Sequence, residues 1–228
     1  MKRLIVTAKL LSVTLSSWAG IINGPSVTTI RVEAAVHNPG GGFDTVLRSD
    51  NNHNPMNISA SNSNGNESAS LTGSFSYSYS DSFFTQDVVF SGSATGSAIY
   101  SGNSGSTWNF SLTTPTTFSI SGTMAPFADT GVGLTLAEQS SNTVFFSYDS
   151  QTQGPAISGL VLLPAGNYYF QTGAHLFAQG VTGSASYSFV ATVPEPSTTL
   201  LGMLAFAGCC FHRRGAIMRR QVRFAQSY

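Results

Sequence analysis

The sequence predicts an all-β fold, a jelly-roll-like antiparallel β-sandwich over residues 68–193. Three observations predict this class. Apolar and polar side chains alternate with a period of two after Leu71, which is typical of half-buried strands. The alternating segments are bounded by Gly, Pro, Asn or Asp, residues that favour turns. No segment of this body carries an amphipathic helical pattern of three turns.

The predicted strands begin at GSFSYSYS, which places Phe75, Tyr77 and Tyr79 on one face and serines on the other. LPAGNY, residues 163–168, has turn residues at the positions that a hairpin requires. Eight or nine such strands predict two packed sheets, and a single sheet closed on itself is the alternative. The further predicted strands are DVVFSGSATGSAIY, STWNFSLT, TTFSISGTM, VGLTLAE, NTVFFSYD, AISGLVLL, NYYFQTGAHLFAQ and SASYSFVATV.

The two segments before the sandwich are predicted to lie outside it. Residues 1–35 have the basic start, apolar stretch and later small residues of a secretory signal peptide. Lys9 interrupts the apolar stretch, the nearest small-residue cleavage site is VEAAV at residues 32–36, and an ordinary strand is the alternative. Residues 36–67 are dense in Asn, Gly, Ser and Pro, so we expect a flexible lead-in with one strand near residues 43–47.

Charge and cysteine positions exclude several classes of function. Between Ser49 and Val193 there is no Lys or Arg and there are seven acidic residues, so the formal charge is 0 − 7 = −7. Nucleic-acid binding needs basic residues that neutralise phosphates, so no nucleic-acid partner is expected. Cys209 and Cys210 are adjacent and lie near the C-terminus, so no disulfide framework, thiol catalysis or Cys-ligated zinc is expected in the body.

The C-terminal segment predicts a short transmembrane helix. The run from Ser197 to Phe211 has no charge over about 15 residues, although a standard span needs about 20. It follows a Pro-Glu-Pro sequence, where the backbone is extended, and precedes clustered arginines, which mark a cytoplasmic end. The basic cluster that would stop transfer through the membrane is Arg213, Arg214, Arg219 and Arg220.

These three parts, VPEPST at residues 193–198, the apolar run and the basic cluster, resemble the PEP-CTERM sorting signal of bacterial exported proteins. The resemblance implies that residues 194–228 are a signal read by an exosortase, a membrane-embedded cysteine transpeptidase that removes the helix and the tail. It also implies export, transient tethering in the inner membrane, and a final place at the cell surface or in a polysaccharide-rich biofilm matrix. The sorting residues are Val193, Pro194, Glu195, Pro196 and Ser197.

The sequence favours a non-catalytic surface or matrix protein, without a metal or cofactor. A glycan-active enzyme would need two carboxylates at a set separation, and the body shows no catalytic motif. A calcium site through Asp129 or Asp149 lacks a D-x-D-x-D loop. The candidate catalytic groups are Asp81, Asp87, Asp129, Glu138, Asp149, His53 and His175.

A carbohydrate-binding module of the cell surface is the stronger alternative, because β-sandwich modules bind sugars with exposed aromatic side chains. Trp108 alternates with Phe110 and is therefore expected to face inward with it. The candidate sugar-binding aromatics are Trp108, Tyr100, Tyr148, Tyr168 and Tyr169.

Overall fold

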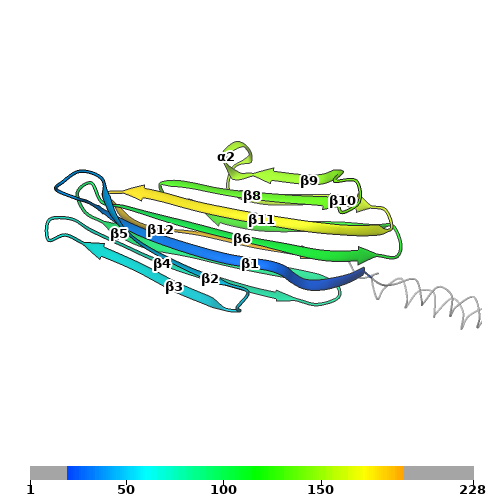
Figure 1. Cartoon of the computed structure of the whole chain (residues 1–228). Coiled ribbons are helices and arrows are strands. Elements are labelled where there is room, and N and C mark those ends of the chain that lie inside the picture. The colour runs from blue at the N-terminus through cyan, green and yellow to red at the C-terminus, as the bar shows by residue number, and fades with distance from the viewer. Residues whose placement is uncertain (1–19, 193–228) are drawn as a thin grey trace, which may run out of the picture. The chain divides into compact units, whose positions relative to one another are not determined.

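The computed structural model describes residues 20–192, which form two six-stranded antiparallel sheets packed face to face (Figure 1). This confirms the predicted β-sandwich and excludes the single closed sheet. Within the described residues, no helix is long and apolar enough to cross a membrane. The predicted C-terminal helix, its basic cluster and the sorting residues lie outside the described residues.

The strand order defines two sheets, here called sheet A and sheet B. Sheet A has the order β2 (Phe43–Asn51), β1 (Gly20–His37), β6 (Ile99–Leu112), β11 (Gly166–Gln179), β8 (Asp129–Glu138), β9 (Val144–Asp149). Sheet B has the order β10 (Ala156–Leu163), β7 (Thr116–Ala125), β12 (Thr182–Thr192), β5 (Phe83–Ala94), β4 (Ser68–Tyr79), β3 (Met56–Ser63). The one described helix is α2 (Ser150–Gln153).

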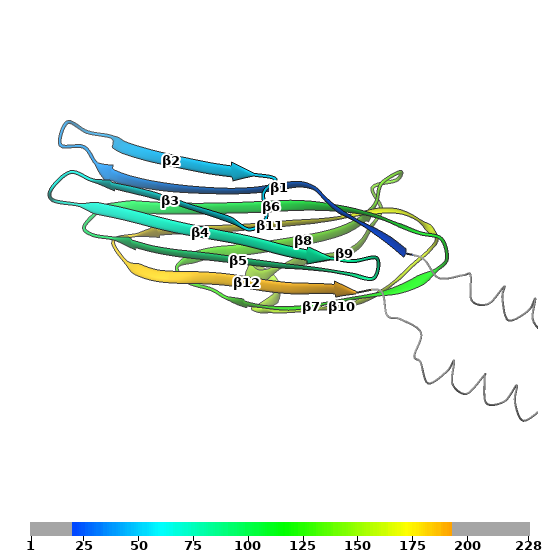
Figure 2. The ribbon, with the colours of Figure 1, turned by 90° about the horizontal axis from the view of Figure 1, so that it is seen from below.

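The connections follow a jelly roll only in part. The chain changes sheet at every step from β5 to β8 and again from β9 to β12. In contrast, β1 and β2, β3 to β5, and β8 and β9 are hairpin-connected neighbours within one sheet. As a result, β2 lies against β3 along one side of the sandwich and β9 lies near β10 along the other side (Figure 2).

The prediction that residues 36–67 form a flexible lead-in is wrong, because β2, β3 and the end of β1 occupy this stretch, but the one strand expected near residues 43–47 is confirmed as β2. Composition misled the prediction here. Asparagines in its loops bond to the backbone of neighbouring segments: Asn64 Nδ2 donates to the carbonyl of His37 at 2.6 Å, and Asn54 Nδ2 donates to the carbonyl of Tyr77 at 2.9 Å. Polar residues are also compatible with β2 and β3 because both are edge strands, with little of their surface in the core.

The predicted export segment is also corrected for residues 20–35, which belong to β1 and pair with β6. Alternate residues of β1, including Ile30, Val32 and Ala34, are fully buried in the core. Cleavage at the VEAAV site would therefore remove most of β1, an inner strand of sheet A. The ordinary-strand alternative is right for this part, and residues 1–19 lie outside the described residues.

Aromatic rings and glycines fill the space between the sheets. Trp108 stacks on Phe84 with ring centroids 5.0 Å apart, which joins β6 of sheet A to β5 of sheet B. Gly102 allows a ring from the opposite sheet to approach closely, since a Cβ there would lie 2.6 Å from Phe90 Cδ1. Gly92 likewise leaves room for the ring of Tyr100, which comes from the opposite sheet. The core thus depends on glycines at inward positions, where any side chain would displace an aromatic ring.

Candidate functional site

The acidic groups singled out from the sequence do not form one cluster: Asp129 and Glu138 lie at opposite ends of β8, Asp87 lies on β5, and Asp149 ends β9. Within residues 20–192, no group of three or more His, Cys, Asp or Glu side chains is placed to hold a metal ion. Each histidine candidate contacts one acid: His53 Nδ1 lies 2.6 Å from Asp50 Oδ1, and His175 Nε2 lies 3.9 Å from Asp129 Oδ1. Neither pair contains the two opposed carboxylates that glycoside hydrolysis requires.

Asp129 and Asp149, the calcium candidates, are held apart by the sheet. Asp149 pairs with Gly133 on β8, four residues along that strand from Asp129, which corresponds to about 13 Å. The side chain of Asp149 instead caps α2, because its Oδ1 accepts a hydrogen bond from the backbone N–H of Gln151 at 2.9 Å. The two carboxylates therefore belong to separate local structures.

Most of the aromatic side chains predicted to bind sugar are in the core. Trp108 faces inward with Phe110, as the alternation predicts, and both are fully buried. Tyr100, Tyr148 and Tyr168 are buried as well, and burial raises the pKa of each phenol above its usual range. Only Tyr169 lies on an outer face.

A buried polar network joins the two sheets at the centre of the core. Gln86 of β5 donates from Nε2 to Thr172 Oγ1 at 3.0 Å and to the hydroxyl of Tyr187, and its Oε1 accepts a hydrogen bond from Ser106 Oγ. Ser106 Oγ in turn accepts from Trp108 Nε1 at 3.1 Å. These side chains satisfy one another inside the protein, so the network fixes how the sheets pack and is closed to a ligand.

The outer face of sheet A carries a different set of side chains along its central strand, β11. Tyr169 and Phe177 point outward toward opposite ends of this strand, about 26 Å apart. Between them, Gln171 and His175 also face outward, and Phe177 is 42% exposed. The same strand thus presents core residues inward and aromatic, amide and imidazole groups outward.

Three outward-facing glycines lie side by side across the middle of this face: Gly105 on β6, Gly173 on β11 and Gly133 on β8. A Cβ built on Gly133 meets no atom within 4 Å, and one on Gly105 or Gly173 meets only ordinary contacts. Along this row the outer surface consists of backbone atoms that no side chain covers. The outer face of sheet A is therefore lower in its middle than at Tyr169 or Phe177.

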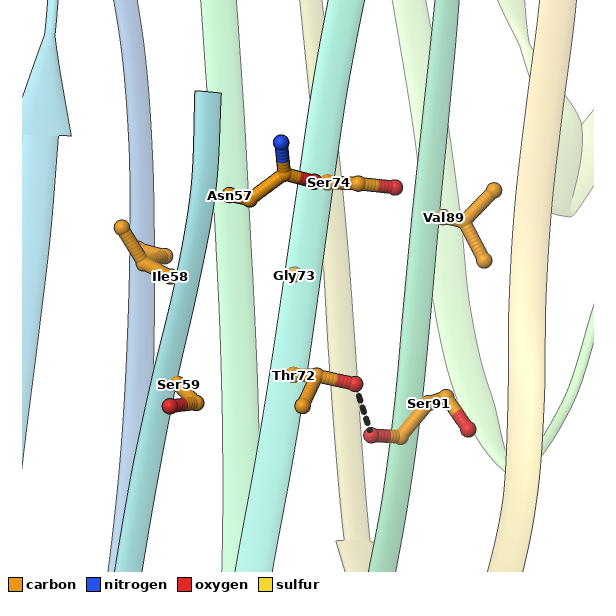
Figure 3. A pocket seen from close by; sticks show the side chains of 8 residues that line it. All are labelled: Asn57, Ile58, Ser59, Thr72, Gly73, Ser74, Val89 and Ser91. Atoms are coloured by element: carbon orange, nitrogen blue, oxygen red, sulfur yellow. Dashed lines mark hydrogen bonds between the residues drawn. The ribbon is translucent and has the colours of Figure 1, made fainter. Parts of the chain in front are cut away.

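The outer face of sheet B is covered by hydroxyl groups. In one row, Ser184, Ser91, Thr72 and Ser59 are neighbours across four adjacent strands. A shallow pocket of about 370 Å³ lies over β3, β4 and β5, and Thr72 Oγ1 at its edge donates to the carbonyl of Ser91 at 3.1 Å (Figure 3). The pocket is lined by Asn57, Ile58, Ser59, Thr72, Gly73, Ser74, Val89 and Ser91. It contains no titratable side chain.

Sequence reasoning missed Phe177 and Gln171 as surface groups. The signal was present, because the two phases of NYYFQTGAHLFAQ separate cleanly into an apolar inner set and a mixed outer set. The buried Gln86 was also missed, although it occupies an inward position between Phe84 and Val88. A polar residue in an apolar phase is the sequence signal for such a network.

Comparison with known proteins gives a weak likeness to sugar-binding modules. No family model and no curated protein matches the chain. One similar solved structure is a carbohydrate-binding module of Cellvibrio mixtus lichenase 5A in complex with cellotriose, at 16% identity and TM-score 0.25, covering 41% of this chain and 79% of that one. Another is from work on promiscuous carbohydrate-binding modules of the β-sandwich superfamily, at 10% identity and TM-score 0.26, covering 73% and 72%. At these values neither likeness bears on the function of this chain.

Proposed function

We propose that this chain is an exported, non-catalytic surface or matrix protein, and that its sandwich contacts extracellular polysaccharide through the outer face of sheet A. The observation that carries the proposal is the outward row of β11, in which Tyr169 and Phe177 flank Gln171, Gly173 and His175. Aromatic rings offer flat apolar surface to the C–H faces of sugars, and amides offer both donors and acceptors to their hydroxyls.

The shape of the face supports a polymer as the ligand. The glycine row leaves the backbone of sheet A open midway between the two rings, so a chain lying along β11 meets no side chain at Gly173. A flat strip of this length suits a polysaccharide better than a single sugar, which binds in an enclosed pocket. The net charge of −7 between Ser49 and Val193 favours neutral over acidic polymers.

Binding to neutral polysaccharides should weaken when the rings are removed. We expect the full chain carrying both Tyr169→Ala and Phe177→Ala to bind at least tenfold more weakly on a polysaccharide array. The control is Phe43→Ala, which removes a ring of similar exposure, 50%, from the edge strand β2. Unchanged binding by the double variant, or no binding by the parent chain to any neutral polysaccharide, would contradict the proposal.

Export and sorting are proposed on the resemblance of residues 193–228 to a PEP-CTERM signal, with an exosortase as the processing partner. In the sorting motif, Glu195 is the one ionisable group between two prolines, each of which restricts the backbone. We expect Glu195→Ala to leave the uncut precursor in the inner membrane of a host with an active exosortase, measured by immunoblotting of membrane and extracellular fractions. Asp87→Ala, a change on the sandwich surface, is the control, and normal processing of the Glu195 variant would contradict this part.

A further inference from the structure

Among the strand edges formed by residues 20–192, the free edge of β10 carries the most exposed large apolar side chains. β10 pairs with β7 on one side, and among residues 20–192 no strand pairs with its other side. Leu160 is 74% exposed and Leu162 is 67% exposed, the two largest values among the bulky apolar side chains of the described residues. Ala156–Leu163 contains no charge and no proline, and its register with β7 is uninterrupted.

Two of the other three edges carry a feature that discourages pairing, and the third, β3, is polar and lies against the other sheet. The edge strand β2 bears three charges, at Asp44, Arg48 and Asp50. The edge strand β9 is short, has an irregular register beside Leu136 and ends at the capping carboxylate of Asp149. β3 presents asparagine and serine rather than leucine outward and lies against β2 of the other sheet. This contrast between β10 and the other edge strands is what a protein–protein interface along β10 would require.

The hydrogen-bond phase of β10 shows which backbone groups are free. The N–H of Met124 on β7 donates to the carbonyl of Pro155 at 2.8 Å, and pairing continues one residue later at Ala156 and Thr123. Bonded and non-bonded pairs alternate in an antiparallel ladder. The N–H and C=O groups that point away from β7 therefore belong to Ala156, Ser158, Leu160 and Leu162.

We infer that β10 pairs antiparallel with β10 of a second copy of this chain, which joins two copies of sheet B into one continuous sheet. Unpaired backbone donors and acceptors in a row fit a β-strand better than any other partner. A two-fold axis at Gly159 places Ser158 opposite Leu160 of the second copy and Ala156 opposite Leu162, so all four free residues find partners.

The side chains fit this arrangement on both faces of the strand. On the outer face, Leu160 lies diagonal to Leu160 of the second copy, so that two exposed leucines cover each other. On the inner face, Phe146 of β9 already covers β10, since a Cβ on Gly159 would lie 2.4 Å from its ring. A second copy can therefore approach only along the edge, where the uncharged β10 brings no like charges together between the two strands. This pairing is independent of polysaccharide binding and would give a matrix protein a link between copies.

Association of the full chain tests the inference, in a mild detergent that shields the apolar run at residues 197–211. We expect sedimentation to show dimers that dissociate at least tenfold more readily with Leu160→Lys, and with Leu160→Pro, which removes a free N–H but no bond to β7. Leu47→Lys, at an exposed leucine of the edge strand β2, should leave association unchanged.

Amide hydrogen exchange gives a readout that needs no variant. The N–H groups of Ser158, Leu160 and Leu162 should exchange slowly at high protein concentration and fast on dilution, because only a second copy bonds them. A parent chain that stays monomeric, a Leu160→Lys variant that associates like the parent, equal dissociation by Leu47→Lys, or fast exchange of these amides at high concentration would each overturn the inference.

Discussion

Gln86→Ala should lower the free energy of unfolding by about 3–5 kcal/mol, because it both opens a cavity and removes the centre of the buried network. Gln86 is fully buried and its amide links Thr172, Ser106 and Tyr187. Truncation leaves part of the hydrogen-bonding capacity of these hydroxyls unused in a site that water does not reach. For a domain of this size we expect the melting temperature to fall by about 10 °C.

Two further variants separate the effect of the cavity from the effect of the lost hydrogen bonds. Gln86→Met keeps most of the side-chain volume and removes the hydrogen bonds, so it should cost about 1–3 kcal/mol. Gln171→Ala removes an amide from the exposed outer face of the same sandwich and should change stability by less than about 0.5 kcal/mol. Urea unfolding followed by circular dichroism measures all three. If Gln86→Ala costs no more than Gln171→Ala, the network does not hold the sheets together.

From the sequence, the inward and outward side chains of the strands were predicted better than the number of residues that belong to the sandwich. Strict alternation of apolar and polar residues predicted which side chains of β4 and β6 face the core, including the burial of Trp108. The same rule applied to residues 28–36 would have revealed β1, where Ile30 and Val32 alternate with charged Arg31 and Glu33. Composition was given more weight than periodicity before residue 68, so β1 was predicted only as an alternative and β3 not at all, whereas the strand expected near residues 43–47 is β2.

Strand order and surface chemistry depend on contacts far apart in the chain, which alternation does not report. β1 pairs with β6, and residues such as Ala34 and Tyr100 are partners across 66 positions. The glycine row of sheet A exists only because β6, β11 and β8 are adjacent in this register. β10 was readable as a strand, but its continuous apolar run is typical of a buried strand, so its exposure at an edge was not evident from the sequence.

The second large effect is a loss of stability in alkali caused by Tyr187. Burial raises the pKa of this phenol from 10.0 to about 12, and the negative charge of Asp87 adds to the shift, while hydrogen bonds from Ser104, Thr172 and Gln86 oppose it. The unfolded chain releases the proton near pH 10, whereas the folded chain holds it until about pH 12. This contribution to stability is therefore complete below pH 10 and is lost as the pH rises to about 12. A shift of this size corresponds to about 3 kcal/mol.

Comparing the parent chain with Tyr187→Phe isolates that contribution, because Tyr100, Tyr148 and Tyr168 also have raised pKa values and remain in both proteins. The variant loses one hydroxyl, but Gln86 Nε2 keeps its bond to Thr172 Oγ1, so at pH 8 we expect it to be only about 1 kcal/mol less stable. Between pH 9 and pH 12 the parent should lose about 2 kcal/mol more than the variant, measured by rapid urea titrations at each pH. The two curves should then cross, with the variant the more stable protein at pH 12. Parallel curves would show that water reaches the Tyr187 hydroxyl and that the polar network at the centre of the sandwich is open to solvent.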